Sequence, residues 1–157
     1  YIRIFAGMYP HEVAGMVLVD PTQEELIEWA RARDPKPEKA LRLYDEVDCA
    51  PATFAQARAN RIPAGIPIVL ISGMGPLEIP GFLPADLKAE VRKDQQTLYP
   101  AKLRFHREWT EKFPTAKLII TKKSGHGIPF EEPELVVNAI RQVIQQSNKT
   151  AGTSSAR

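Results

Sequence analysis

The sequence has few of the features that mark several large protein classes. Its 157 residues include one cysteine, Cys49, which has no partner for a disulfide and no companions for a zinc cluster. It contains no run of about 18 apolar residues, and no basic-then-apolar leader opens it. We therefore expect a cytoplasmic protein without a membrane span, in which Cys49 is a small structural residue and no metal is needed for folding.

The charges also lack a dominant sign. Lysine and arginine number 21 against 19 for aspartate and glutamate, and the basic residues are scattered along the chain. A nucleic-acid-binding protein would gather them on one face, so no nucleic-acid partner is predicted. Apolar residues make up 43% and charged residues 25% of the chain. These values are typical of a folded globular domain.

Three continuous apolar runs are present, at Val13–Asp20, Ile66–Ser72 and Ala116–Thr121. Continuous rather than alternating apolar residues are typical of parallel strands that are buried on both faces. Helical patterns separate the runs, so we predict an α/β fold with a parallel sheet and right-handed crossovers. Three strands are fewer than the about 4 to 6 of a usual sheet, which predicts a partial sheet.

The first half of the chain is rich in helical patterns. A helix is predicted over Tyr1–Tyr9, before Pro10. Between the first two strands, Thr22–Ala64 reads as a helical insertion, with Thr22 as the N-cap of its first helix and further pieces at Glu38–Val47 and Ala52–Asn60. This insertion is longer than a crossover needs, so we expect it to form a cap over a site.

The second half continues the pattern. Helices are predicted over Ala85–Leu98, from Pro100 to Phe113 and over Glu134–Gln146, and Ser147–Arg157 reads as a disordered tail. The chain begins without methionine, inside a helical pattern that has no capping residue. We therefore expect a fragment, with a domain over residues 1–146 and a tail over 147–157.

Polar residues lie at the ends of the apolar runs or in the loop after them: Asp20, Ser72 and His126. Ligands of open parallel sheets bind beyond the carboxyl ends of the strands, so these side chains are the candidates for chemistry. Asp20 has the alternative of accepting backbone N–H bonds in the turn with Pro21. His126, between Gly125 and Gly127, has the alternative of an exposed loop histidine.

Two longer segments carry a resemblance to a known family. Ser124–Val136, with the sequence SGHGIPFEEPELV, resembles the catalytic-histidine segment of the α/β-hydrolase family. Tyr1–Pro21 resembles the helix that follows the nucleophile elbow of that family and then its sixth strand. The resemblance covers about residues 1–146 and is weak in the variable cap.

The resemblance implies a serine hydrolase with the chain order serine, acid, histidine. It makes His126 the general base and places the acid at Asp20 or Glu78. We prefer Asp20, because a carboxylate at a strand end is held more rigidly than one on a loop rich in glycine and proline. The implied substrate is a small ester, amide or similar molecule, and no cofactor or metal is implied.

The nucleophile of such an enzyme is missing from the chain. No Gly-x-Ser-x-Gly occurs in the 157 residues, and Ser72 lacks the preceding glycine. The resemblance therefore implies the C-terminal half of a hydrolase, inactive alone, with its elbow upstream of Tyr1. The oligomeric state stays open.

Two other functions remain. A hydrolase-like binding module without catalysis fits the same residues. A phospho-receiver-like domain would use Asp20, Ser72 and Lys122, but several helices separate the first two, no acidic pair precedes Asp20 and no proline follows Lys122. His11 and His106 are expected in a turn and on a helix face, and Trp29 and Trp109 in packing.

Overall fold

The fold is built on a parallel sheet. The computed structural model describes residues 1–33, 50–76, 79 and 81–154. Its strands are β1 (Met16–Val19), β2 (Ile68–Gly73) and β3 (Ala116–Thr121), in the order β1-β2-β3, and both pairings are parallel. All residues of the central strand β2 are buried. The predicted parallel α/β architecture is confirmed.

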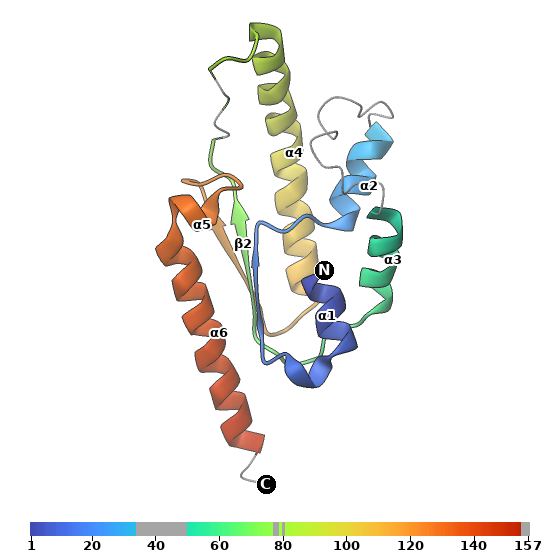
Figure 1. The fold of residues 1–157 in the computed structure, drawn as a ribbon, viewed down its shortest axis with the longest axis vertical. Coiled ribbons are helices and arrows are strands. Elements are labelled where there is room, and N and C mark those ends of the chain that lie inside the picture. The colour runs from blue at the N-terminus through green and yellow to red at the C-terminus, as the bar shows by residue number, and fades with distance from the viewer. Residues whose placement is uncertain (34–49, 77–78, 80, 155–157) are drawn as a thin grey trace.

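Helices cover both faces of this sheet (Figure 1). The long helix α4 (Ala85–Glu111) and the short α1 (Ile2–Met8) lie on one side, and α6 (Pro133–Ser154) lies on the other. The remaining elements are η1 (Pro10–Glu12), α2 (Glu24–Arg33), α3 (Ala50–Ala59) and α5 (Ile128–Glu131). The molecule thus has three layers, and the carboxyl ends of the strands point toward α5.

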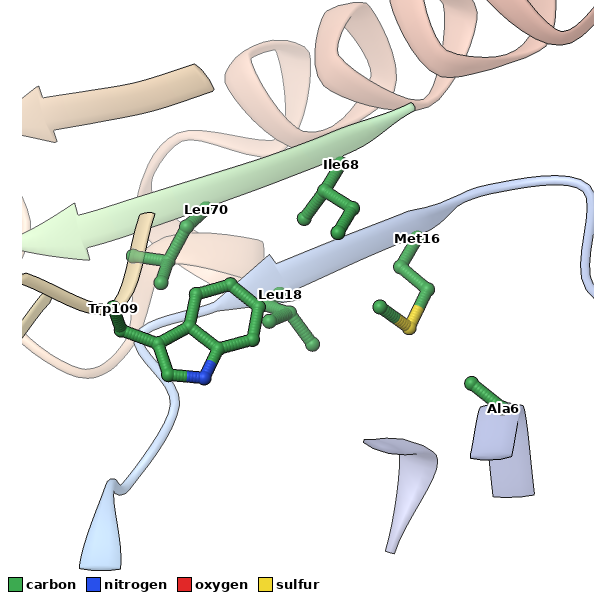
Figure 2. Packing of buried hydrophobic residues seen from close by; sticks show 6 residues of the cluster. All are labelled: Ala6, Met16, Leu18, Ile68, Leu70 and Trp109. Carbon is green, nitrogen blue, oxygen red and sulfur yellow. The ribbon is translucent and has the colours of Figure 1, made fainter. Parts of the chain in front are cut away.

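The first core lies between the sheet and the layer of α1 and α4. Figure 2 shows the side chains that form it: Ala6, Met16, Leu18, Ile68, Leu70 and Trp109. The strand members alternate along β1 and β2, because successive side chains of a strand point to opposite faces. The packing role expected for Trp109 is confirmed.

The second core lies between the sheet and α6. Its buried members are Val69, Ile71, Ile128, Ala139 and Val143. They include the other side chains of β2, so both faces of that strand are covered. Burial on both faces explains why the apolar runs in the sequence are continuous.

Helix α4 differs from the prediction. The sequence predicts one helix that ends at Leu98 and a second that starts at Pro100, but α4 runs unbroken with Pro100 inside. A proline in a helix interior removes one hydrogen bond and costs about 3 kcal/mol. The turns after it are held on the sheet by buried residues such as Ala101 and Trp109, which favours continuation of the helix.

The helical insertion is described in part. Helix α2 begins at Glu24, and the carbonyl of Gln23 accepts its first hydrogen bonds, so Thr22 is not the N-cap. Helix α2 packs on α4, and α3 contacts α1. The predicted helix over Glu38–Val47 and the role of Cys49 lie outside the described residues.

Part of the predicted tail is helical. Helix α6 continues to Ser154, beyond the end predicted at Gln146. The polar residues after Gln146 include no proline to stop it, and the Ser147 hydroxyl donates to the carbonyls of Val143 at 2.9 Å and Ala14 at 2.7 Å. The bond to Ala14 ties the helix to the loop before β1. Residues 155–157 are not described.

No helix within the described residues combines the length and the apolar character that crossing a membrane requires.

Candidate functional site

The candidate site lies where the strands end. Asp20 directly follows β1, and His126 lies in the loop between β3 and α5. The structure brings these two predicted residues together: Nδ1 of His126 is 3.0 Å from Oδ2 of Asp20. Parallel strands place their carboxyl ends at one edge, which is why residues so distant in sequence meet there. Glu78, the alternative acid, lies outside the described residues.

The bond to Asp20 fixes the role of each imidazole nitrogen. An ionised carboxylate only accepts hydrogen bonds, so Nδ1 of His126 carries the proton and donates it. A neutral ring then has its lone pair on Nε2. The His126 side chain is 70% exposed, whereas the Asp20 side chain is 5% exposed. A buried carboxylate therefore orients an accessible basic nitrogen, the arrangement that general base catalysis needs.

The Asp20 backbone adopts an unusual conformation. Its φ is 42°, in the left-handed region that costs most residues about 1 kcal/mol or more but that aspartate tolerates better. The N–H of Asp20 donates to the carbonyl of Ile71 at 2.7 Å, and the N–H of Gly73 donates to Oδ1 of Asp20 at 2.9 Å. The end of β2 thus holds both the backbone and the side chain of the acid.

A lysine that the sequence analysis missed also binds Asp20. Nζ of Lys102, from α4, is 3.0 Å from Oδ1 and 3.2 Å from Oδ2, and 2.5 Å from the carbonyl oxygen of Gly73. A usable signal exists in the sequence: Lys102, His106 and Trp109 share one helix face by their spacing. Polar residues on a face that also carries a core tryptophan mark a buried polar contact.

His106 is the second missed residue: it lies on a helix face, as expected, but that face of α4 is turned into the molecule. It is fully buried, and its Nε2 lies 3.0 Å from the carbonyl oxygen of Pro21. That carbonyl only accepts, so Nε2 carries the proton, and Nδ1 accepts from the Ser72 hydroxyl at 2.8 Å. Burial lowers the pKa of His106 below its usual value and favours this neutral form.

The loop that carries His126 is anchored through Glu132. This carboxylate accepts from the hydroxyls of Ser124 at 2.6 Å and Thr121 at 2.5 Å. These two hydrogen bonds lower the pKa of Glu132. Ser124 is fully buried, so the anchor lies two residues before an exposed histidine.

Glycines allow the loops after β2 and β3 to approach closely. A Cβ atom on Gly73 would lie 1.9 Å from the carbonyl oxygen of Gly125, and one on Gly75 would lie 2.6 Å from that of Lys123. The N–H of Gly75 donates to the carbonyl of Ser124 at 2.8 Å. Side chains at these positions would push the His126 loop away from Asp20.

An open cavity borders this loop. Its volume is about 520 Å³, and its wall includes Pro76, Arg92 and Tyr99. The Tyr99 hydroxyl donates to the carbonyl of Gly75 at 3.0 Å and lies 3.7 Å from the position of a Cβ on Gly125. The cavity is therefore next to the residue that precedes His126.

The residues of the receiver-like alternative do not converge in the same way. Lys122 is exposed, and the ammonium that binds Asp20 belongs to Lys102. Ser72 is buried and donates to His106. The three strand ends thus supply two separate contacts, Asp20 with His126 and Ser72 with His106.

Comparisons of the chain with protein-family models, curated proteins and solved structures find no match. Among the residues that the structure describes, no group of three or more histidine, cysteine, aspartate or glutamate side chains is placed to hold a metal ion.

Proposed function

We propose that this chain supplies the acid and the base of a serine-type α/β-hydrolase that acts on a small ester, amide or similar substrate. The observation that carries the proposal is the 3.0 Å contact between buried Asp20 and exposed His126. The sequence also supports the proposal. Asp20 lies in Tyr1–Pro21 and His126 lies in Ser124–Val136, the two segments that resemble the α/β-hydrolase family.

The proposed chemistry follows from the geometry of the pair. Nε2 of His126 takes the hydroxyl proton as a serine attacks the substrate carbonyl, and it returns this proton to the leaving group. Asp20 keeps the Nδ1 proton in place and stabilises the imidazolium that forms. Once the leaving group has departed, water attacks the acyl-serine ester. Nε2 of His126 takes a proton from this water and passes it to the serine oxygen, which releases the acid product.

The two serines nearest the site are poorly suited to be the nucleophile. Ser72 and Ser124 are fully buried, and their hydroxyls donate to His106 and Glu132. We therefore propose that the serine and the oxyanion-hole donors are provided by residues upstream of Tyr1, as the resemblance implies.

The coding sequence upstream of Tyr1 offers the test. We expect it to encode Gly-x-Ser-x-Gly, and we expect the longer protein to be labelled at that serine by a fluorophosphonate probe. His126→Ala should abolish the labelling, whereas His11→Ala, a change at an exposed histidine, should leave it intact.

Two results would reject the enzyme. Labelling that survives His126→Ala would show that His126 does not activate the serine. Another residue at the serine position, in a protein that still folds, would favour the non-catalytic binding module.

A further inference from the structure

Lys102 has a defined place in the site. Its side chain is 12% exposed, and its ammonium contacts both carboxylate oxygens of Asp20 and the carbonyl oxygen of Gly73. It also lies over the ring of Tyr99, with Nζ 4.7 Å from the ring centroid. These contacts leave Lys102 little freedom, and they place its ammonium directly against the candidate acid.

Asp20, Lys102 and a neutral His126 together carry no net charge, and this balance requires Lys102. Asp20 carries one negative charge in a buried place, and Lys102 carries one positive charge against it. His126 can then be neutral without leaving a buried charge uncompensated. If the ammonium were absent, the His126 ring would be the cationic partner left to Asp20 among the described residues, and a nearby opposite charge favours the protonated form of an imidazole.

We propose that Lys102 is a positioning residue that compensates the charge of Asp20, so that His126 remains neutral and keeps its Nε2 lone pair. This inference rests on the proposed function, in which Nε2 must accept a proton. Lys102 acts through Asp20, since the amine contacts Asp20 and leaves the exposed face of His126 open.

The other charged groups near His126 do not replace this contribution. Lys122 and Lys123, on the same loop, are exposed to solvent, which screens them. Glu132 is occupied by Thr121 and Ser124. Among the described residues, two further groups lie near the pair: Glu131, whose carboxylate lies against Gly127, and His106, which burial keeps neutral.

Substitutions at Lys102 can separate its charge from its shape. Lys102→Met keeps most of the length of the side chain and removes the charge and the donors. Lys102→Gln removes the charge but keeps a donor for Asp20. Lys93→Met, at an exposed position on the same helix, is the matched control.

The readout is the pH titration of the His126 ring in the 157-residue chain, followed by ¹⁵N chemical shifts of the imidazole nitrogens. We expect both Lys102 variants to move the midpoint of the His126 titration to higher pH, because they leave Asp20 without its cation. Lys93→Met should leave the midpoint unchanged. A merely structural role of Lys102 would not move it in a folded variant, and circular dichroism verifies the fold of each.

An unchanged midpoint in folded Lys102→Gln would overturn the inference, and this variant decides if Lys102→Met does not fold. Asp20→Asn distinguishes the failure of this inference from the failure of the proposed function. If Asp20→Asn changes the His126 signals and the Lys102 variants do not, Lys102 has no electrostatic role but the acid–base pair stands. If Asp20→Asn changes nothing, the pair itself is absent.

Discussion

Asp20 receives hydrogen bonds from three elements of the fold: Gly73 at the end of β2, Lys102 on α4 and His126 after β3. Its position at a strand end could be predicted from the sequence, because Asp20 directly follows an apolar run. The contact with His126 could be predicted too, since parallel strands end at one edge of the sheet. Lys102 could not be placed in this way, because its contact depends on how α4 crosses the sheet.

Replacement of Asp20 tests its role as the acid. In the longer protein, we expect Asp20→Asn to lower the acylation rate by about 10⁴-fold, the usual scale when the histidine loses the residue that fixes its tautomer. Stopped-flow acylation with an activated ester measures this rate. We expect a much smaller loss for Glu78→Gln, and the reverse ranking would move the acid to Glu78.

His106 predicts a pH dependence of stability. Its pKa is lowered by burial in the folded chain, so the unfolded chain binds a proton that the folded chain excludes. The free energy of unfolding should therefore fall as the pH drops below about 6.5, until the lowered pKa is passed. His106→Gln should reduce this fall, as measured by urea denaturation at pH 7.5 and 5.5.

The exposed His11 provides the control for that experiment. We expect His11→Gln to keep the pH dependence of the unmodified chain. If the free energy of unfolding fell equally from pH 7.5 to pH 5.5 in the His106 and His11 variants, the assignment of a neutral, buried His106 would be contradicted.

At the scale of elements, strands were more predictable than helix ends. The run Ala116–Thr121 coincides with β3, because an apolar segment between polar turns has few other places in the fold. Pro100 was misleading, since its local preference for a helix start is overridden by packing of the following turns on the sheet. Ser147 shows the same effect, because its contact with Ala14 is invisible in the local sequence.

The close approach of the β2 and β3 loops gives a prediction at this scale. We expect Gly73→Ala to destabilise the chain and to separate His126 from Asp20, because its Cβ would overlap the carbonyl of Gly125. Thermal unfolding measures the first effect and the imidazole ¹⁵N shifts measure the second.

Gly81→Ala is the matched control, since a Cβ at Gly81 meets no atom within 4 Å. Gly81 lies in a turn before α4, and Gly81→Ala should change the melting temperature little, because it acts mainly through the conformational freedom of the unfolded chain. If Gly73→Ala and Gly81→Ala had the same melting temperature and the same His126 ¹⁵N shifts, the loops after β2 and β3 could separate without cost.

At the scale of the whole molecule, β1 is an edge strand of the described sheet. Met16 and Asp20 direct their N–H groups to β2, so Val17 and Val19, which alternate with them, direct theirs to the open side. Nearby α1 and its C-cap Tyr9 expose large apolar side chains: Ile2, Phe5, Met8 and Tyr9. An open edge beside an exposed apolar face favours association.

We therefore expect the 157-residue chain to self-associate with rising concentration in sedimentation velocity. Replacing Ile2 and Met8 with glutamine should weaken the association by removing apolar surface from α1. Phe82→Gln, at an exposed phenylalanine outside α1, is the control. A monodisperse monomer with strongly protected amides from Met16 to Val19 would show that the described sheet is self-sufficient.

The most direct test of the acid–base pair is the tautomer of neutral His126, read from the imidazole ¹⁵N shifts of the 157-residue chain. We expect the proton on Nδ1, held by Asp20, and the lone pair on Nε2. In Asp20→Asn this preference should be lost or strongly reduced. A neutral His126 that carries its proton on Nε2 in the unmodified chain, with no change in Asp20→Asn, would contradict the pair and with it the proposed hydrolase.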